Sequence, residues 1–224
     1  MKTTVQASVT SLAGFVVFGL LVFGFAGTFD YWRGWAFIAV FATATLIPSG
    51  YLARRNPEAL RRRMQAGPQA ETRPLQKLVI AIAFISMGAM IAVSALDFRF
   101  GWSSVPAVVS IVGLVLVAGG LTIAMLVTIQ NDYAAANVTV ESGQQLSSTG
   151  WYGFVRHPMY FGNVILMIGV PLALGSWWGL VFVPVGLAVL VLRIGDEEAL
   201  LTRDLAGYRE YTQKVRYRLV PYVW

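Results

Sequence analysis

Residues 105–129 read VPAVVSIVGLVLVAGGLTIAMLVTI, and their 25 side chains include no charged group. This stretch decides the class of fold, because about 20 consecutive apolar residues suffice for a helix to cross the hydrocarbon core of a bilayer. A helix on the surface of a soluble protein instead has one apolar and one polar face. The stretch therefore predicts a transmembrane helix.

Three segments upstream have a similar length and composition, at 8–29, 32–53 and 75–96. Over the whole chain 57% of the residues are hydrophobic and 12% are charged, against about 25% charged residues in an ordinary soluble domain. Only Lys2 precedes the first segment as a positive region and no clear small-residue cleavage site follows it, so we expect a retained span rather than a removed signal peptide. The sequence predicts an all-α, polytopic transmembrane helical bundle with four full spans.

A fifth apolar stretch runs from 159 to 193, too long for a single span at about 1.5 Å per residue. Pro171 and Gly175 interrupt it near its middle, where a helix is expected to break. We predict two shorter helices, 159–174 and 178–193, folded as a membrane-embedded helix hairpin.

The segment after this hairpin is expected to form a C-terminal amphipathic helix. It begins with the acids at 196–198 and runs to about Val215. Leu201, Leu205 and Tyr208 recur at spacings of three or four residues, which puts them on one face of a helix. That face can lie on the bundle or on the membrane interface.

Basic residues are distributed unevenly along the chain. With both termini in the cytoplasm, only Arg33 and Arg99 of the 17 Lys and Arg residues face outward, which agrees with the positive-inside rule. We therefore expect a multi-pass integral membrane protein whose basic cytoplasmic loop, 54–77, contacts anionic membrane lipids. Nucleic-acid binding is not expected, because the long apolar segments leave no room for a soluble nucleic-acid-binding domain.

The composition also limits the chemistry. Cysteine is absent and His157 is the single histidine, so disulfides and thiolate nucleophiles are excluded. A zinc or iron site usually needs several His, Cys or carboxylate ligands, so no metal is expected. We divide the chain into a four-helix transmembrane region, 1–129, and a region 130–224 that carries the polar motifs.

The first motif, Arg156-His157-Pro158-Met159-Tyr160, lies where a polar loop enters the membrane. Pro158 suits the first turn of the following helix, because it lacks a donor that this turn would leave unpaired. Tyr160 and Asn163 are three residues apart and share one face of that helix. The motif is typical of a binding site, but an interfacial pair of side chains that binds lipid phosphate has the same composition.

The second motif contains Arg193, Glu197 and Glu198. Arg193 and Glu197 are four residues apart and can pair on a helix. Acids beside a membrane-embedded hairpin are costly unless a polar group meets them, and a bound cation or a hydroxyl-rich ligand would do so. The alternative is an interaction with the dipole of a helix that begins at these acids. For residues 131–133, which follow the fourth span, we expect only a helix stop.

The stretch STGWYGFVRHPMYFG at 148–162 resembles the signature of the isoprenylcysteine carboxyl methyltransferase family of membrane proteins, which in turn resembles the phospholipid N-methyltransferases. The acids at 196–198, followed by Gly207-Tyr208 and Tyr211, look like the second motif of that family. Two departures are the tryptophan at position 151, where a proline is common, and the lack of a Gly-x-Gly of the phospholipid N-methyltransferase type.

The resemblance implies S-adenosylmethionine as the cofactor, held where the Arg-His-Pro-x-Tyr loop meets the paired acids. Carried over by position, the cofactor-binding residues are Tyr152, His157, Tyr160, Asn163, Glu197 and Glu198. Arg156 and Arg193 would hold or orient the substrate, and Glu197 is the third residue expected to act in catalysis. Region 130–224 is then the methyltransferase catalytic region, on the cytoplasmic side.

The resemblance further implies a lipophilic acceptor, either an isoprenylcysteine-type carboxylate or another lipid or lipidated substrate. A carboxylate is already anionic, whereas an amine or a phenol needs a base, for which His157 or a glutamate is the candidate. Two alternatives stay open: an NADPH-dependent membrane lipid or sterol reductase of related architecture, and a non-catalytic membrane protein. No oligomeric state is predicted.

Overall fold

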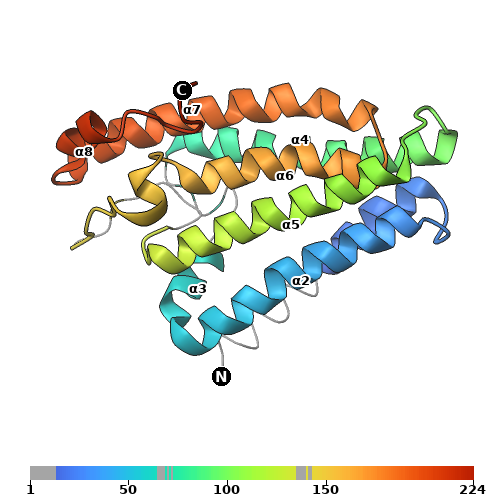
Figure 1. Cartoon of the computed structure of the whole chain (residues 1–224), viewed down its shortest axis with the longest axis horizontal. Coiled ribbons are helices and arrows are strands. Elements are labelled where there is room, and N and C mark those ends of the chain that lie inside the picture. Colours follow the sequence, from blue (N-terminus) through green and yellow to red (C-terminus); the bar gives the residue numbers. More distant parts are fainter. Residues whose placement is uncertain (1–13, 65–68, 70, 72, 135–139, 141–142) are drawn as a thin grey trace.

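The computed structural model of the chain describes residues 14–64, 69, 71, 73–134, 140 and 143–224. Six apolar helices lie along the long axis of the molecule (Figure 1). Within the described ranges no residue is in a β-strand. The predicted all-α helical bundle is confirmed.

The apolar helices have clear bounds. The N-terminal helix is described from residue 14 and contains the π-helix η1 (Leu20–Gly24); it is followed by α2 (Trp32–Arg55), α4 (Pro74–Phe100), α5 (Ala107–Gln130), α6 (Pro158–Leu174) and α7 (Phe182–Asp204). The shorter elements are α3 (Pro57–Met64), α8 (Tyr208–Lys214) and the 3-10 helices η2 (Gly150–Gly153) and η3 (Trp178–Val181).

By length and composition, four stretches can cross a membrane: α2, α4, α5 and the continuous stretch Trp178–Asp204, which joins η3 to α7. The chain is therefore an integral membrane protein. The number of long spans agrees with the prediction, but their identity differs, because the second arm of the predicted hairpin is one of them. Of the predicted first span, 8–29, residues 8–13 lie outside the described residues, and the described helix ends before Gly27, whose φ is 70°.

The predicted hairpin turn is present. Gly175 ends α6 with a φ of 74°, and the amides of Gly175 and Ser176 donate to the carbonyl oxygens of Leu172 and Pro171 at 3.0 and 2.9 Å. A positive φ is strained for any residue with a Cβ atom, so a glycine at this turn is required.

The second arm of the hairpin is longer than predicted. We expected it to end at 193 and a new helix to begin at Asp196, whereas α7 continues without a break to Asp204, and only the short helix α8 follows. Gly195 is tolerated inside the helix, because a single glycine costs about 1 kcal/mol there and does not break it. The predicted amphipathic helix 196–215 is therefore wrong, and so is the interpretation of the acids as partners of a helix N-terminus.

The closest packing in the bundle is between α5 and α6, whose backbones touch. A Cβ atom at Gly113 would lie 2.2 Å from the amide nitrogen of Ala173, and one at Gly120 would lie 2.5 Å from the carbonyl oxygen of Gly162. Glycines at such positions allow two helices to approach closely. Gly119 takes no part in the contact, because a Cβ atom there would have no neighbour within 4 Å. This contact holds the first turns of α6 in place.

The two ends of the bundle differ. The connections 101–106 and 175–177 are short and lie at one end, whereas α3, α8 and the segments that precede α6 lie at the other (Figure 1). The polar motifs of the sequence meet at this second end.

Candidate active site

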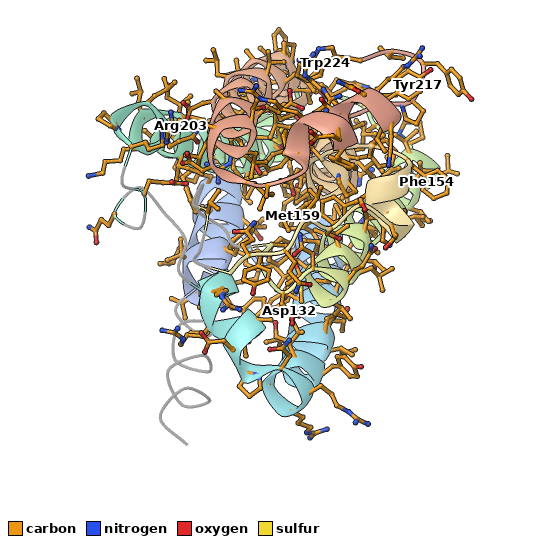
Figure 2. All side chains as sticks on the ribbon, turned by 90° about the vertical axis from the view of Figure 1, so that its left-hand side faces the viewer. Asp132, Phe154, Met159, Arg203, Tyr217 and Trp224 are labelled. Carbon is orange, nitrogen blue, oxygen red and sulfur yellow. The ribbon has the colours of Figure 1, made fainter. Side chains whose placement is uncertain are left out.

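A pocket opens at the end of the bundle that carries α3 and α8. The space between its walls is about 820 Å³ when the open mouth is counted. Figure 2 looks onto this end of the molecule, with Met159 near the centre, Asp132 below it and the C-terminal helices above it. The lining comes from three parts of the chain: the segment after α5 (Asn131, Tyr133, Ala134, Gln144, Gln145, Leu146, Ser147, Tyr152), the start of α6 (Arg156, His157, Pro158, Met159, Tyr160), and α7 with α8 (Glu197, Leu200, Leu201, Leu205, Tyr208, Tyr211).

The His-Pro turn at the start of α6 is held by the C-terminal tail. The backbone amides of Arg156 and His157 donate to the carbonyl oxygens of Tyr217 and Arg218, both at 2.9 Å. His157 is the N-cap residue of α6 and Pro158 occupies the first helical turn, as expected for a proline that needs no donor. The turn is therefore fixed from outside the helix that it begins.

Glu198 ties this turn to α7 and to the tail. Its carboxylate accepts hydrogen bonds from Arg156 Nε at 2.7 Å and from Arg218 Nε at 2.8 Å, and it lies 3.3 Å from His157 Nε2. Arg156 Nη1 also donates to the carbonyl oxygens of Val215 and Arg216 at 3.0 and 3.1 Å. Charge-assisted hydrogen bonds are stronger than hydrogen bonds between neutral groups. Glu198 and Arg156 therefore hold together the start of α6, the end of α7 and the C-terminal tail.

The second glutamate takes part in a different network. Glu197 accepts a hydrogen bond of 2.6 Å from the hydroxyl of Tyr160, and that hydroxyl accepts one of 2.8 Å from Arg193 Nε. Arg193 Nη1 donates to the carboxylate of Glu71 at 3.0 Å and to the side-chain oxygen of Gln76 at 2.8 Å. The side chains of Arg193 and Glu71 are 6% and 1% exposed, so this ion pair is buried beneath the pocket.

The network continues to the segment before α4. The side-chain amide of Gln76 donates to Asp196 at 2.6 Å, and Arg73 forms an ion pair of 2.6 Å with the same carboxylate. The start of α4 and the site-bearing part of α7 are thereby joined by side chains that are more than 100 residues apart in the sequence.

Tyrosine hydroxyls hold the rim of the pocket. The hydroxyl of Tyr152 accepts a hydrogen bond of 3.0 Å from Asn131, and the hydroxyl of Tyr211 donates to the backbone carbonyl of Tyr152 at 2.7 Å. Burial raises the pKa of Tyr152 to about 12, and burial likewise raises the pKa of Tyr211 above its usual range. Both phenols are therefore neutral at physiological pH and act as hydrogen-bonding groups rather than as bases.

The structure brings most of the predicted site residues together. Among them, the pocket lining includes Tyr152, Arg156, His157, Tyr160 and Glu197. Arg193 and Glu198 lie behind the lining and contact it through Tyr160 and through Arg156 and His157. Asn163 is half-buried, one turn further along α6, and is not part of the lining.

Several residues of the site were missed by the sequence reasoning. Asn131 and Tyr133 were interpreted as a helix stop, although both line the pocket. Glu71 and Gln76 gave no signal, because they precede or begin a span and their contacts are with a distant helix. Tyr208 was assigned to the apolar face of a helix and to the second family motif but not to the cofactor site, yet it lines the pocket and its buried hydroxyl has no hydrogen-bond partner among the described residues.

Fold and site together define an integral membrane helical bundle with a polar, tyrosine-rich pocket at one end. Residues 108–206 match the family model described as phospholipid methyltransferase, the family that includes the isoprenylcysteine carboxyl methyltransferases. Residues 108–206 are thus similar to a membrane methyltransferase domain, and the resemblance inferred from the motifs is confirmed. The matched residues contain every predicted site residue, whereas Tyr208 and Tyr211 lie beyond them.

A second similarity is to a reductase. The chain is 34% identical over 90 residues to the Delta(14)-sterol reductase TM7SF2 of Mus musculus, which covers 39% of this chain and 22% of the reductase. The chain thus matches about a fifth of the length of that relative.

Proposed function

We propose that this protein transfers a methyl group from S-adenosylmethionine to a lipophilic acceptor at the cytoplasmic face of the membrane. The observation that carries the proposal is the convergence of the His-Pro turn and the paired glutamates on one pocket. The Tyr160 and Glu197 side chains are 2.6 Å apart there, and those of His157 and Glu198 are 3.3 Å apart.

The side chains present fit this cofactor. A sulfonium cation is attracted by aromatic ring faces and by carboxylates, and the lining contains Glu197 together with the rings of His157 and Tyr160, which are stacked with centroids 5.5 Å apart. Neutral phenols such as Tyr152 offer hydrogen bonds to uncharged polar groups. We assign cofactor contacts to these four residues, and Asn163 stays a prediction from the family.

S-adenosylmethionine, when bound, supplies an electrophilic methyl group, so little covalent work is left for the protein. The residues of the pocket then contribute by positioning donor and acceptor and by a pre-oriented electrostatic surround. Glu197 is the candidate to accept a proton from an amine or phenol acceptor. It is held for this by Tyr160, which in turn is held by Arg193.

Arg193 and Glu198 are better described as positioning residues than as substrate contacts. Arg193 donates to Tyr160, Glu71 and Gln76, and Glu198 accepts from Arg156 and Arg218. Neither lines the pocket. We therefore propose a positioning role for both residues, in place of the predicted contacts of Arg193 with the substrate and of Glu198 with the cofactor.

The membrane setting of the pocket supports a lipophilic acceptor. The apolar helices lie in the membrane and the pocket lies at their end, so a lipid substrate reaches it from the bilayer while a water-soluble cofactor enters from the cytoplasm. An isoprenylcysteine-type carboxylate is one acceptor of this kind. For it, Arg156 is the one arginine in the described lining of the pocket, and an arginine contacts a carboxylate well.

The experiment that tests the function uses the purified full chain in lipid nanodiscs. The protein receives methyl-labelled S-adenosylmethionine and a total lipid extract, and labelled products are identified by mass spectrometry. Binding of S-adenosylmethionine and of NADPH is measured in parallel by calorimetry. A labelled lipid supports the proposal; NADPH binding without S-adenosylmethionine binding favours the reductase, and binding of neither compound favours a non-catalytic protein.

A further inference from the structure

The hydroxyl of Tyr208 is the observation that the proposed function leaves unexplained. Tyr208 is 3% exposed, and its oxygen has no hydrogen-bond partner among the described residues. Buried hydroxyl groups in proteins nearly always have a partner, and one without a partner calls for a specific explanation. A bound ligand is one, because Tyr208 is part of the pocket lining.

Three other tyrosines of the pocket lining show the contrast. Tyr152 accepts from Asn131, Tyr160 is bonded to Glu197 and Arg193, and Tyr211, one helical turn after Tyr208, donates to the carbonyl of Tyr152. These three hydroxyls are satisfied by the protein itself. The hydroxyl of Tyr208 has no such partner in the described part of the chain, so it can form a hydrogen bond with a group that is not part of the protein.

The surroundings of Tyr208 limit the chemistry of that group. Tyr208 belongs to an apolar cluster with Leu205 and Tyr211, against which Leu146 and Leu201 pack, and all five side chains line the pocket. Such walls suit a flat, largely apolar ring with a polar edge. The lining also contains Glu197 of α7, together with Tyr160 and His157 from the start of α6. Glu197 is close enough to act electrostatically on the Tyr208 hydroxyl, so the apolar cluster and the carboxylate belong to one continuous pocket.

We infer that the apolar part of the pocket at α8 binds a purine base and that the Tyr208 hydroxyl forms a hydrogen bond with its polar edge. The inference rests on the proposed function for the source of the base, an adenosyl compound with a cationic end directed toward Glu197. The base of an adenine dinucleotide has the same chemistry, so the experiment separates the two sources. Because Tyr208 is a neutral phenol, it can either donate to a ring nitrogen or accept from an amino group.

The test compares Tyr208→Phe with the wild type and with Tyr211→Phe as a matched control in the same helix. Each variant keeps the ring and loses one hydroxyl. For the protein in nanodiscs without ligand, we expect the Tm of Tyr208→Phe to equal or exceed that of the wild type, because no hydrogen bond is lost. The Tm of Tyr211→Phe falls, because the Tyr152 carbonyl loses its donor. A lowered Tm for Tyr208→Phe would mean that its hydroxyl has a partner in the protein, which would overturn the inference.

Ligand affinity is the second readout. S-adenosylhomocysteine is expected to bind Tyr208→Phe about 3- to 10-fold more weakly than the wild type, the effect of one hydrogen bond. Wild-type affinity in this variant would overturn the inference. If the wild type binds NADPH and not S-adenosylhomocysteine, the methyltransferase proposal fails; a similar loss of NADPH affinity in Tyr208→Phe would still support the base site. If the wild type binds neither compound, both proposals fail.

Discussion

The two ends of the helical bundle both hold buried carboxylates, but these have different kinds of partner. At the end with the short connections, Asp97 is fully buried and accepts from three neutral donors: the amide of Ser103 at 2.7 Å, its hydroxyl at 2.6 Å, and the hydroxyl of Ser176. At the end with the pocket, the buried carboxylate of Glu71 and the half-buried carboxylate of Glu198 each pair with at least one arginine.

The partners of Asp97 explain the role of its end. They come from the connection after α4 and from the turn between α6 and α7, so one carboxylate ties both connections together. A carboxylate that is satisfied by fixed dipoles rigidifies its surroundings. The nearby Tyr31 hydroxyl adds a hydrogen bond to the carbonyl of Leu174, the last residue of α6.

At the other end, polar satisfaction is incomplete. Ion pairs surround an open pocket there, and the hydroxyl of Tyr208 has no partner. Ionisable groups in a membrane protein are costly and mark functional sites, whereas buried pairs by themselves are weak evidence of stability. Each end thus has a buried polar atom without a partner within the described ranges, Arg33 Nε at the end with the short connections and the Tyr208 hydroxyl at this one. Because Tyr208 is part of the pocket lining, we expect a ligand to complete the end that carries the pocket.

The largest effect is expected when the buried ion pair between Arg193 and Glu71 is broken. Arg193→Ala removes the arginine partner of Glu71 and one donor to Tyr160. Breaking a buried pair on one side typically costs about 3–5 kcal/mol, so the free energy of unfolding should fall by this amount in denaturant titrations of detergent-solubilised protein. Changing Arg193 and Glu71 together to leucine should recover part of the loss. If the single and double variants lose equally, the pair does not act as a unit.

The next effect tests the opposite end. Asp97→Ala leaves the amide and hydroxyl of Ser103 and the hydroxyl of Ser176 without their acceptor. We expect a loss of about 2–4 kcal/mol in the free energy of unfolding, with no change in the Kd of S-adenosylmethionine for the folded protein. Ser103→Ala is the control and should lose less. A weakened Kd in Asp97→Ala would contradict the separation of the two ends.

A smaller effect is expected from Glu197 and tests whether its carboxylate faces the cationic end of the cofactor. Glu197→Gln removes a negative charge and keeps the size of the side chain. Because S-adenosylmethionine carries a sulfonium and S-adenosylhomocysteine does not, the variant should weaken the former about 10-fold more than the latter, or about 1.4 kcal/mol. Calorimetry with both compounds measures the difference. Equal losses for the two would show that Glu197 does not face the cation.

The smallest effect is expected at Asn163. It is the one predicted cofactor residue that neither lines the pocket nor has a hydrogen bond to a lining residue in the structure. Asn163→Ala should therefore change the Kd of S-adenosylhomocysteine less than about 2-fold, which is under about 0.5 kcal/mol. His157→Ala, six residues earlier in the same segment, serves as the comparison and should weaken binding clearly. If Asn163→Ala weakens the binding of S-adenosylhomocysteine as much as His157→Ala does, Asn163 contacts the cofactor after all.

Much of the fold was determined by local sequence. Uninterrupted apolar stretches predict spans because the hydrocarbon core offers no partner for an exposed backbone, and Gly175 predicts the turn because few other residues adopt a positive φ. The His-Pro turn was also predictable, since Pro158 suits only the first turn of a helix. The pocket lining at Tyr152, His157 and Tyr160 follows from these local features and from the family motif.

What only the tertiary structure decided is which distant side chains meet. Glu71 lies 122 positions before Arg193, and no local pattern reports such a pair. The same holds for Tyr208, whose missing partner is visible only once its neighbours are in place, and for Glu198, which faces arginines rather than the pocket. The physical reason is that hydropathy and turn residues set where a helix begins and ends, whereas its rotation and neighbours depend on the packing of the whole bundle.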